Sequence, residues 1–473
     1  MKVLLTGSTG YIGRRLKQQL LKNSIIDLRL FVRNKNSISS EVLQKVEVFE
    51  GDTFDTRSLE KALSGVDVAY YLIHSLNRDN YKELDKKSAQ NFVDIASQCG
   101  VKKIIYLGGL GVKDEYTSEH LLSRLETGEI LSSNSNVQTI WIRAGVIIGS
   151  GSASFEIIRN LAEKLPVMLT PKWVETKAQP IAVEDVIQYL ESSLFLEQKK
   201  NLIVDIGTEQ LSYRQMMLKT ASALGLQRYI IKVPFMSITV SSYWLNLFTP
   251  VPFSVAKALI EGLKSEVVKQ NDNAKIYFPH IKPISYEEAV KKATQEIKEN
   301  QVISRWNDNS GEIWDRDHKK QINDAVFVDR KEGNISGIEA SKVYNSFISI
   351  GGENGWFDFD FLWEIRGIVD KMLGGVGLKR GRRSQCDLRT GDCLDFWKVI
   401  DIQKEKRLLL YAQMKLPGEG WLEFKIENDK LIQSAYFYPR GVWGRIYWYT
   451  LVPLHYFVFT NMLHNIIKKS KKV

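Results

Sequence analysis

Short apolar runs alternate with longer segments of helical periodicity over the first three hundred residues. Runs of this kind are typical of strands that are buried on both faces of a parallel sheet. They lie at residues 3–5, 28–32, 46–50, 66–73, 103–107, 139–143 and 202–206. Predicted helices lie at 14–22, from 56, at 81–99, from 118, at 213–224 and at 287–300. This alternation predicts a doubly wound α/β domain, in which ligands bind beyond the carboxyl ends of the strands.

After residue 340 the pattern of apolar and polar residues is typical of an antiparallel sheet. Predicted strands lie at residues 346–350, 393–401, 407–416, 421–427 and 431–438, and a helix is predicted at 360–373. In the strand at 421–427, Leu422, Phe424 and Ile426 alternate with larger or charged residues, which indicates a sheet with one wet face. The last helix, 442–468, is apolar on nearly every side, so we expect it to be buried or to contact a membrane. These patterns predict an α+β domain whose final helix covers the sheet, with a ligand cavity between them.

Two segments fit neither pattern. Residues 307–320 are polar and show no apolar periodicity, so the domain boundary is placed there, between domains at 1–300 and 341–473 with a linker at 301–340. Residues 230–268 are rich in apolar and aromatic side chains and are interrupted by three prolines, which excludes one membrane-spanning helix. The alternatives for this segment are a lid over the substrate site, a surface between the domains, or an ordinary part of the core.

The composition says more about where in the cell the protein is found than about any reaction that it catalyses. The chain of 473 residues carries 65 Lys and Arg against 55 Asp and Glu, a net charge of +10 that is spread along the sequence apart from basic runs at 379–383 and 468–472. This charge suits an anionic cofactor or an anionic membrane face, and without a reader motif it does not indicate nucleic acid. Three unclustered cysteines and the absence of a secretory signal predict a cytoplasmic protein with no disulfide framework and no metal site.

A glycine motif, TGSTGYIG, ends the first predicted strand and opens the first predicted helix. Glycines in this place let the backbone approach a pyrophosphate closely, and the amides at the start of a helix favour negative charge. The spacing is G-x-x-G-x-x-G, whereas the usual dinucleotide motif is G-x-G-x-x-G. The predicted cofactor-binding residues of this turn are Gly7, Ser8, Thr9, Gly10, Tyr11, Ile12 and Gly13.

The ends of the next two strands supply further polar residues. Arg33 ends the strand at 28–32, where a carboxylate would hold the ribose of NAD, and a guanidinium there suits the 2′-phosphate of NADP instead. The alternative for Arg33 is an ordinary solvated arginine. Asp52 and Thr53 follow the third strand, and Asp52 is expected to hydrogen-bond the adenine or to cap the helix that begins near Thr56.

The segments TGSTGYIG, GDTFD and YLGGLG, together with the Arg33 strand end, resemble the extended and atypical branches of the short-chain dehydrogenase/reductase superfamily. The resemblance covers about residues 1–300 and implies a Rossmann fold with an NAD(P) cofactor. It also implies that the neighbouring strand ends line the cofactor, with Ala144 and Gly145 packing on the nicotinamide. The residues expected there are Leu72, His74, Gly108, Ala144 and Gly145.

The active-site residues of that superfamily are missing from their expected places. Where the superfamily has serine, tyrosine and lysine, this chain has Gly108, His120 and Arg124. A histidine exchanges protons near neutral pH, and an arginine can hold a ribose. His120 and Arg124 lie four residues apart and therefore on one face of a helix. The alternatives are a site that binds cofactor without chemistry, and Tyr116 as the proton donor.

The second half resembles the domain of unknown function in a bacterial two-domain family. The segments that carry the match are GGENGW, LWEIRG, GGVGLKRGRR, GDCLDFWKV, MKLPGEGWLEF and FYPRGVWGRIYWYTLVPLH, and the HLLSR segment around His120 agrees with the same family. Its antiparallel sheet and last helix are similar to START-like, helix-grip folds that bind hydrophobic ligands, an analogy of fold only.

These observations predict an NADP(H)-dependent oxidoreductase that acts on a hydrophobic small molecule, with His120 as the proton donor and Arg124 as the anchor for ribose or substrate. Two alternatives remain: a non-catalytic NAD(P)H sensor that regulates the second domain, and an epimerase or dehydratase that holds NAD tightly. Peripheral membrane contact through the last helix is a further expectation.

Overall fold

The computed structural model forms two compact units, Met1–Trp306 and Asn307–Val473. It describes residues 1–74, 80–115, 117–233, 261–262, 265–299, 301–306, 322, 325–356, 360–372, 375, 377, 382–384 and 387–471. Tyr116, most of the predicted lid at 230–268 and part of the basic run at 379–383 lie outside these residues. Each unit is described on its own.

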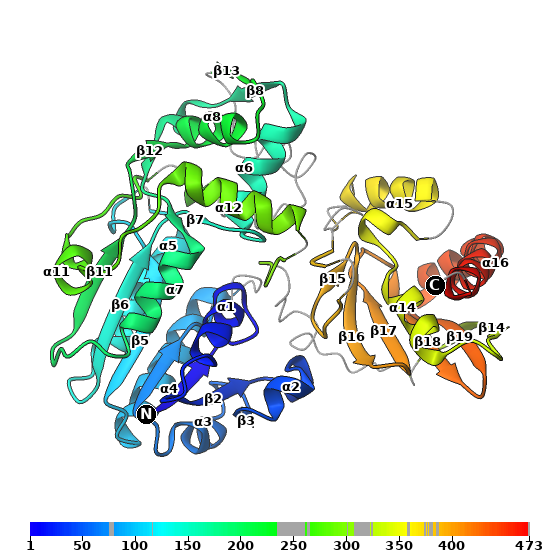
Figure 1. Ribbon diagram of the computed structural model, residues 1–473, viewed down its shortest axis with the longest axis horizontal. Coiled ribbons are helices and arrows are strands. Elements are labelled where there is room, and N and C mark those ends of the chain that lie inside the picture. The colour runs from blue at the N-terminus through cyan, green and yellow to red at the C-terminus, as the bar shows by residue number, and fades with distance from the viewer. Residues whose placement is uncertain are drawn as a thin grey trace. The chain divides into compact units, whose positions relative to one another are not determined.

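A parallel sheet of seven strands, in the order β11-β6-β5-β4-β1-β2-β3, forms the centre of the first unit (Figure 1). Its strands are β1 (Lys2–Thr6), β2 (Asp27–Val32), β3 (Glu47–Glu50), β4 (Val68–Tyr71), β5 (Lys103–Gly109), β6 (Gln138–Ala144) and β11 (Leu202–Ile206). The strand order reverses between β1 and β4, and open parallel sheets bind ligands at such a switch point. The predicted Rossmann-like sheet is confirmed.

Helices cover both faces of this sheet. The helices on one face are α1 (Tyr11–Leu20) and α7 (Val183–Ser192), and those on the other are α3 (Thr56–Leu63), α4 (Tyr81–Gln98) and α5 (Glu119–Leu131). Successive side chains of a strand point to opposite faces. Val3 and Leu5 therefore join the core with α1 and α7, while Leu4 joins the core with α3, α4 and α5.

A smaller layer, with its own core, extends the first unit beyond the sheet (Figure 1). Its helices are α6 (Ala153–Lys164), α8 (Tyr213–Ala223) and α12 (Tyr286–Lys298), and its strand pairs are β7 (Ile147–Ile148) with β10 (Ile181–Ala182), β8 (Val167–Thr170) with β13 (Tyr229–Lys232), and β9 (Lys177–Ala178) with β12 (Leu211–Ser212). The remaining short elements are α2 (Ser40–Leu43), α11 (Asn273–Tyr277), η1 (Lys35–Ser37) and η2 (Lys172–Glu175).

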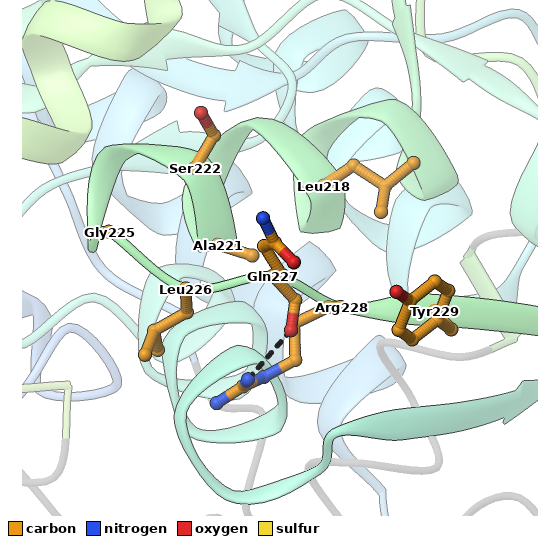
Figure 2. A pocket seen from close by; sticks show the side chains of 8 residues that line it. All are labelled: Leu218, Ala221, Ser222, Gly225, Leu226, Gln227, Arg228 and Tyr229. Carbon is orange, nitrogen blue, oxygen red and sulfur yellow. Dashed lines mark hydrogen bonds between the residues drawn. The ribbon is translucent and has the colours of Figure 1, made fainter.

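A pocket of about 480 Å³ lies where α8 ends and β13 begins (Figure 2). Eight residues line it: Leu218, Ala221, Ser222, Gly225, Leu226, Gln227, Arg228 and Tyr229. Arg228 is its one charged residue, and the guanidinium donates to the backbone carbonyls of Ala162, Glu163 and Gln227. This guanidinium is therefore engaged within the protein, and the other polar side chains of the lining are Ser222, Gln227 and Tyr229.

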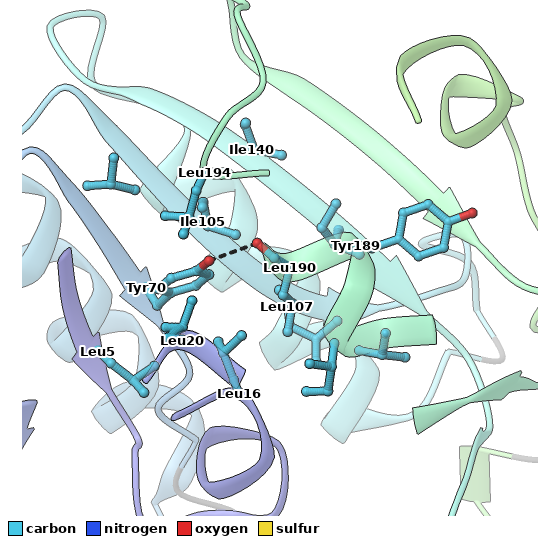
Figure 3. Close-up of a cluster of buried hydrophobic side chains, with 14 of the residues drawn as sticks. Leu5, Leu16, Leu20, Tyr70, Ile105, Leu107, Ile140, Tyr189, Leu190 and Leu194 are labelled. Atoms are coloured by element: carbon cyan, nitrogen blue, oxygen red, sulfur yellow. Dashed lines mark hydrogen bonds between the residues drawn. The ribbon is translucent and has the colours of Figure 1, made fainter. Parts of the chain in front are cut away.

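Two long-range polar contacts fix α7 against the sheet. The Tyr70 hydroxyl, at the centre of the apolar cluster in Figure 3, donates to the Leu190 carbonyl at 2.8 Å. The Lys103 ammonium donates to three carbonyls just beyond the helix, those of Ser193, Leu194 and Leu196, at 2.9 to 3.1 Å. Carbonyls at the end of a helix lack partners within the helix, so this buried cation satisfies them.

The second unit is an antiparallel sheet of six strands, covered on one face by helices (Figure 1). The strand order is β14-β19-β18-β17-β16-β15. Its elements are β14 (Phe327–Asn334), α14 (Ala340–Ile348), η4 (Gly352–Asn354), α15 (Asp360–Met372), β15 (Cys393–Leu394), β16 (Trp397–Gln403), β17 (Arg407–Ala412), β18 (Gly418–Glu427), β19 (Lys430–Pro439) and α16 (Gly441–Ser470). The antiparallel sheet and the long final helix are confirmed, and the ligand cavity between them stays a prediction.

Two sequence predictions for this unit are wrong. Residues 346–350, predicted as a strand, fall at the end of α14, where Val343 and Phe347 lie four residues apart on the buried face. The predicted linker at 301–340 contains β14, which pairs with β19 along all eight of its residues. The strand is polar and lies at the edge of the sheet, so its sequence lacks the apolar run of a buried strand. Within the described residues no helix is both long and apolar enough to cross a membrane.

Candidate functional site

The glycine turn between β1 and α1 is built so tightly that side chains are excluded. Gly7 has a φ of +66°, and a Cβ placed there would lie 2.4 Å from the carbonyl oxygen of Leu72. A Cβ on Gly13 would lie 2.0 Å from the carbonyl oxygen of Gly7. The Gly10 amide donates to the Gly7 carbonyl at 3.0 Å and closes the turn. Glycine is therefore required at both positions, for backbone conformation at the first and for close approach at both.

This turn fits the diphosphate of a dinucleotide. Gly10 precedes α1 without a side-chain cap, and the first turn of the helix contains no acidic residue. The first amides of a helix have no partner within it, so these donors suit an anion. The Ser8 hydroxyl is fully buried and has no hydrogen-bond partner among the described residues. An unpaired buried donor beside free helix amides is what a phosphate oxygen would satisfy.

Two predicted members of the turn use their side chains inside the protein. The Tyr11 ring lies under the Arg15 guanidinium, 5.4 Å from its centroid, and burial raises the pKa of the Tyr11 hydroxyl. Ile12 packs against the core between the sheet and α1. Their backbone amides, rather than their side chains, are therefore the groups that a phosphate would meet.

Arg15 anchors the buried side of α1, the helix that follows the glycine turn. Its guanidinium donates to the backbone carbonyl of Ser150 at 3.0 Å, to the hydroxyl of Ser150 at 2.7 Å and to Glu296 at 3.2 Å. The carboxylate of Glu184 lies 3.7 Å away. These contacts join α1 to α12 and to the start of α7, so the helix that follows the glycine turn is held on its buried side.

The ends of β2 and β3 differ from the prediction in one respect. Arg33 follows β2 directly and is exposed, and its contact with a 2′-phosphate stays a prediction. Asp52 accepts from the Phe54 amide at 3.1 Å, but the residue that caps α3 is Asp55, which accepts from the Arg57 amide. The predicted capping role of Asp52 is therefore wrong, because Asp55, the residue directly before α3, takes the capping position.

Thr53 is buried, and its hydroxyl belongs to a chain of hydroxyl groups inside the protein. It lies 2.7 Å from the Ser88 hydroxyl, which in turn lies 2.7 Å from the Tyr71 hydroxyl. The side chain of Thr53 therefore supports the loop after β3. Its role in cofactor binding stays a prediction for its backbone only.

Four side chains from three segments meet beyond the ends of β4 and β5. His74 follows β4, Asp85 lies on α4, and His120 and Ser123 lie on α5. The Nδ1 atom of His74 is 2.7 Å from Oδ2 of Asp85, and its Nε2 atom is 3.0 Å from Nδ1 of His120. The Ser123 hydroxyl donates to the same Oδ2 atom of Asp85 at 3.2 Å. The result is a continuous chain from carboxylate to imidazole to imidazole.

The hydrogen-bond chain determines where the protons lie when both histidines are neutral. A buried carboxylate requires a donor, so Nδ1 of His74 carries a proton and Nε2 of His74 accepts. Nδ1 of His120 must then carry the other proton and donate to His74. This leaves Nε2 of His120 as the nitrogen that none of the described hydrogen bonds uses, with a lone pair directed away from the chain.

Burial disfavours the charged form of both histidines. Desolvation lowers the pKa of His74, opposed by its bond to Asp85, and the nearby Arg124 lowers it further. Desolvation, His74 and Arg124 together lower the pKa of His120 well below its usual range. The pair is therefore held neutral at physiological pH, and a proton added to His120 leaves readily.

Arg124 lies one helical turn after His120, as predicted. Its Nε atom is buried and lacks a hydrogen-bond partner among the described residues, and its backbone carbonyl accepts from the Tyr106 hydroxyl at 2.9 Å. A Cβ on Gly109 would lie 3.5 Å from Cδ of Arg124. The side chain thus crosses the end of β5, with a donor left for a ligand.

The other predicted strand-end residues serve packing. A Cβ on Gly108 would lie 2.3 Å from the indole nitrogen of Trp141, so this glycine makes room for a tryptophan. Gly145 lies against Val267, and Ala144 is buried at the end of β6. Their contact with a cofactor stays a prediction.

Sequence reasoning missed Asp85 and Ser123 and gave His74 only a cofactor-binding role. A signal for Asp85 was present, because Ser88, Ala89 and Phe92 follow it at three, four and seven residues on the buried face of α4. A carboxylate on an apolar helix face needs a partner, and that partner is His74. Ser123 lies three residues after His120 and faces the same carboxylate.

The lowered pKa values predict a loss of stability in acid. The unfolded chain binds protons at these histidines more readily than the folded chain, so the free energy of unfolding must fall as the pH drops through the usual histidine range. We expect the melting temperature of wild type to fall more between about pH 7.5 and about pH 5.5 than that of His120→Gln. Calorimetry at the two pH values measures this, with His280→Gln, at an exposed histidine, as the control. Equal falls in wild type and His120→Gln would contradict the described burial.

Two family models match the chain, one in each unit. The model described as NAD(P)H-binding matches residues 7–143, which contain the glycine turn, His74, Asp85 and His120. The model described as a protein of unknown function, DUF2867, matches residues 321–462.

Relatives and solved structures match a part of the chain. A sanguinarine reductase from Eschscholzia californica is 25% identical over 256 residues, covering 44% of this chain and 89% of the relative. A ceramide reductase from Caulobacter vibrioides is 24% identical over 268 residues, covering 54% and 82%. The triphenylmethane reductase of Citrobacter sp. has the same fold, with a TM-score of 0.51, 20% identity and coverage of 62% of this chain and 100% of that chain. Another structure of that reductase was solved in complex with NADP(H).

Proposed function

Because the first unit is an NAD(P)-binding Rossmann domain of the reductase- and epimerase-like kind, joined to a DUF2867 domain, we propose that the protein is an NADP(H)-dependent reductase of a hydrophobic small molecule. The observation that carries the proposal is the hydrogen-bonded chain of Asp85, His74 and His120 at the ligand-binding edge of the sheet. The chain supplies a group for proton transfer where the related enzymes' usual tyrosine and lysine are missing.

In this proposal some residues hold the cofactor and the substrate, and others transfer a proton. When bound, the nicotinamide supplies or accepts a hydride. The turn from Gly7 to Gly13 holds the diphosphate with amide donors. In the neutral pair Nε2 of His120 carries a lone pair, so it takes a proton from the substrate during oxidation. During reduction it gives the substrate a proton that it has first taken from water. His74 and Asp85 orient the ring of His120 and stabilise its positive charge while Nε2 carries the proton. Arg124 holds an anionic or hydroxyl group of cofactor or substrate.

The names of the relatives support an apolar substrate. Sanguinarine, ceramide and triphenylmethane dyes differ in chemistry, but each is dominated by rings or hydrocarbon chains. The NAD(P)H-binding family model matches residues 7–143, which hold the glycine turn and the histidines. We propose the shared property, a large apolar body next to a reducible group, as the substrate class.

Preference for NADP(H) is proposed from Arg33. A guanidinium forms two hydrogen bonds with a 2′-phosphate, and hydrogen bonds to charged groups contribute about 1.5–3 kcal/mol. We therefore expect Arg33→Ser to weaken NADPH binding by about 10- to 100-fold and to leave NADH binding unchanged. Fluorescence titration with both nucleotides measures this. Arg57→Ser, which removes another exposed arginine, is the matched control. Equal losses for both nucleotides would remove the argument for NADP(H).

Turnover is tested by adding NADPH to the full-length protein with a panel of apolar carbonyl, iminium and alkene compounds, while NADPH absorbance is followed. Net oxidation of NADPH with a reduced product supports the reductase. A product at the same oxidation level as the substrate, with NADPH unchanged, would indicate an epimerase instead of a reductase. Tight NADPH binding with no product from any compound would favour the sensor.

A further inference from the structure

The second unit exposes an apolar face on α15. Phe361, Ile365, Ile368 and Met372 lie at spacings of four, three and four residues and are 57%, 55%, 55% and 81% exposed. This spacing places them along one side of the helix. In a helix at the surface of a globular protein such a stripe normally points to the core. Here it points to solvent.

The first half of α16 also exposes apolar side chains to solvent. Val442, Trp443, Ile446, Tyr449 and Phe457 are between 49% and 77% exposed. The second half of the helix is ordinary by comparison, because Val458, Phe459, Met462, Leu463 and Ile466 are buried in the core against the sheet. The part of the helix with exposed apolar side chains runs from residue 441 to 457 and is about 25 Å long, at 1.5 Å for each residue. The rest of the helix belongs to the core.

The two exposed faces belong to neighbouring helices. The Arg366 guanidinium on α15 lies near enough to the Tyr447 hydroxyl on α16 to oppose the rise in its pKa that burial causes, and it donates to the Lys415 carbonyl at 3.1 Å. Soluble proteins rarely expose connected apolar patches of more than a few hundred Å², and larger ones mark interaction sites. The exposed apolar side chains of α15 and of the first half of α16 are therefore a candidate for such a site.

The C-terminal part of the sequence carries an excess of basic residues, which favours an anionic partner. Two of them already pair within the unit, Lys430 with Glu332 and Arg440 with Glu419. The sequence contains no Asp or Glu after Asp429, while its basic residues there are Lys430, Arg440, Arg445, Lys468, Lys469, Lys471 and Lys472. Arg445 lies among the exposed apolar residues of α16, and Glu364 is the exposed acidic residue described on α15. Exposed Trp443, Tyr449 and Tyr456 add side chains that prefer the boundary between hydrocarbon and water.

We propose that the outer faces of α15 and of the first half of α16 bind the surface of an anionic lipid membrane. Both helices would lie in the plane of the surface, with apolar side chains among the upper acyl chains and Arg445 and the basic tail near the headgroups. A second copy of this chain is a poorer occupant, because it would bring the same excess of basic residues to the contact. A bound membrane also gives the first unit access to apolar molecules dissolved in lipid.

Co-sedimentation of the full-length protein with vesicles tests this proposal. We expect binding to phosphatidylcholine vesicles that contain phosphatidylserine, weaker binding to phosphatidylcholine alone, and loss of binding at high salt. The double variant Ile365→Asp/Ile446→Asp should bind at least about tenfold more weakly, because it places charge in each stripe. Both residues are exposed, so the fold should tolerate the changes. Ile25→Asp, at a 61% exposed isoleucine of the first unit, is the matched control.

Three results would overturn the proposal. They are no binding to either vesicle, equal binding by wild type and the double variant, and a dimer in solution that the double variant dissociates. NADPH titration of the same variants separates this proposal from the proposed function. We expect unchanged NADPH affinity in the double variant whether or not the reductase assignment holds.

Discussion

Gly7→Ala is expected to remove measurable NADPH binding while the protein remains folded. An alanine at a φ of +66° is strained by about 1–2 kcal/mol, and its Cβ would meet the Leu72 carbonyl at 2.4 Å. The turn must move to relieve this contact, and the amides of the turn then no longer face the diphosphate. Each lost hydrogen bond to a charged oxygen is worth about 1.5–3 kcal/mol, so we expect NADPH affinity to fall at least about 100-fold.

The chain offers a close control for backbone strain. Gly65 has a φ of +70°, and no atom lies within 4 Å of a Cβ built there. Gly65→Ala should therefore cost similar stability and leave NADPH titration unchanged. Gly13→Ala, whose Cβ would lie 2.0 Å from the Gly7 carbonyl, should behave like Gly7→Ala. Normal NADPH binding by both Gly7→Ala and Gly13→Ala would show that the turn is structural and would withdraw the reductase proposal.

His120→Gln is expected to lower kcat by about 10²- to 10⁴-fold, the usual contribution of a positioned acid or base. Glutamine approximates the reach of the ring and can still donate to Nε2 of His74, but it cannot exchange a proton near neutral pH. NADPH affinity should change little, because the proposed contact of His120 is with the substrate. The measurement is kcat with the best compound from the substrate panel, beside NADPH titration of the same preparation.

A second variant separates proton transfer from positioning. Asp85→Asn leaves His120 intact but replaces the acceptor that orients His74. We expect a smaller loss of kcat and a shifted pH profile, because the proton arrangement on the two rings is no longer fixed. His280→Gln is again the control. Unchanged turnover in His120→Gln would assign the chemistry to another group and leave the histidine chain as a structural network.

The sequence was sufficient for the main sheet because burial on both faces leaves a strong pattern. Runs such as residues 28–32 and 103–107 are apolar apart from Arg29 and Lys103, and each lies in a strand of the parallel sheet. The glycine turn was also readable, because close backbone approach leaves no residue but glycine at Gly7 and Gly13. The polar edge strand β14 and the helix α14 were missed, because one lacks an apolar run and the other is short and rich in β-branched and aromatic residues.

The candidate site was only partly predictable, because its parts meet through tertiary packing. His120 and Arg124 could be paired by helical spacing alone. Their relation to His74 and Asp85 depends on how α4 and α5 pack against each other and on the loop after β4, which no local pattern specifies. For Asp52 and Thr53 the position in the sequence was predicted correctly but the role of the side chain was not. Sequence position alone does not tell whether a polar side chain faces a ligand or the interior.

The anchoring of the glycine turn also has a consequence for synthesis of the chain. The Ser304 hydroxyl donates to the Tyr11 carbonyl, a contact between residues 293 positions apart, and Arg15 reaches Glu296 on α12. At about 5–20 residues per second, a ribosome needs roughly 15–60 seconds to add the segment that completes these contacts. During that interval the nascent chain carries the phosphate-binding sequence but lacks part of its support. Cofactor capture is therefore expected to follow release of the whole first unit from the ribosome, and a nucleotide present then would trap the finished fold.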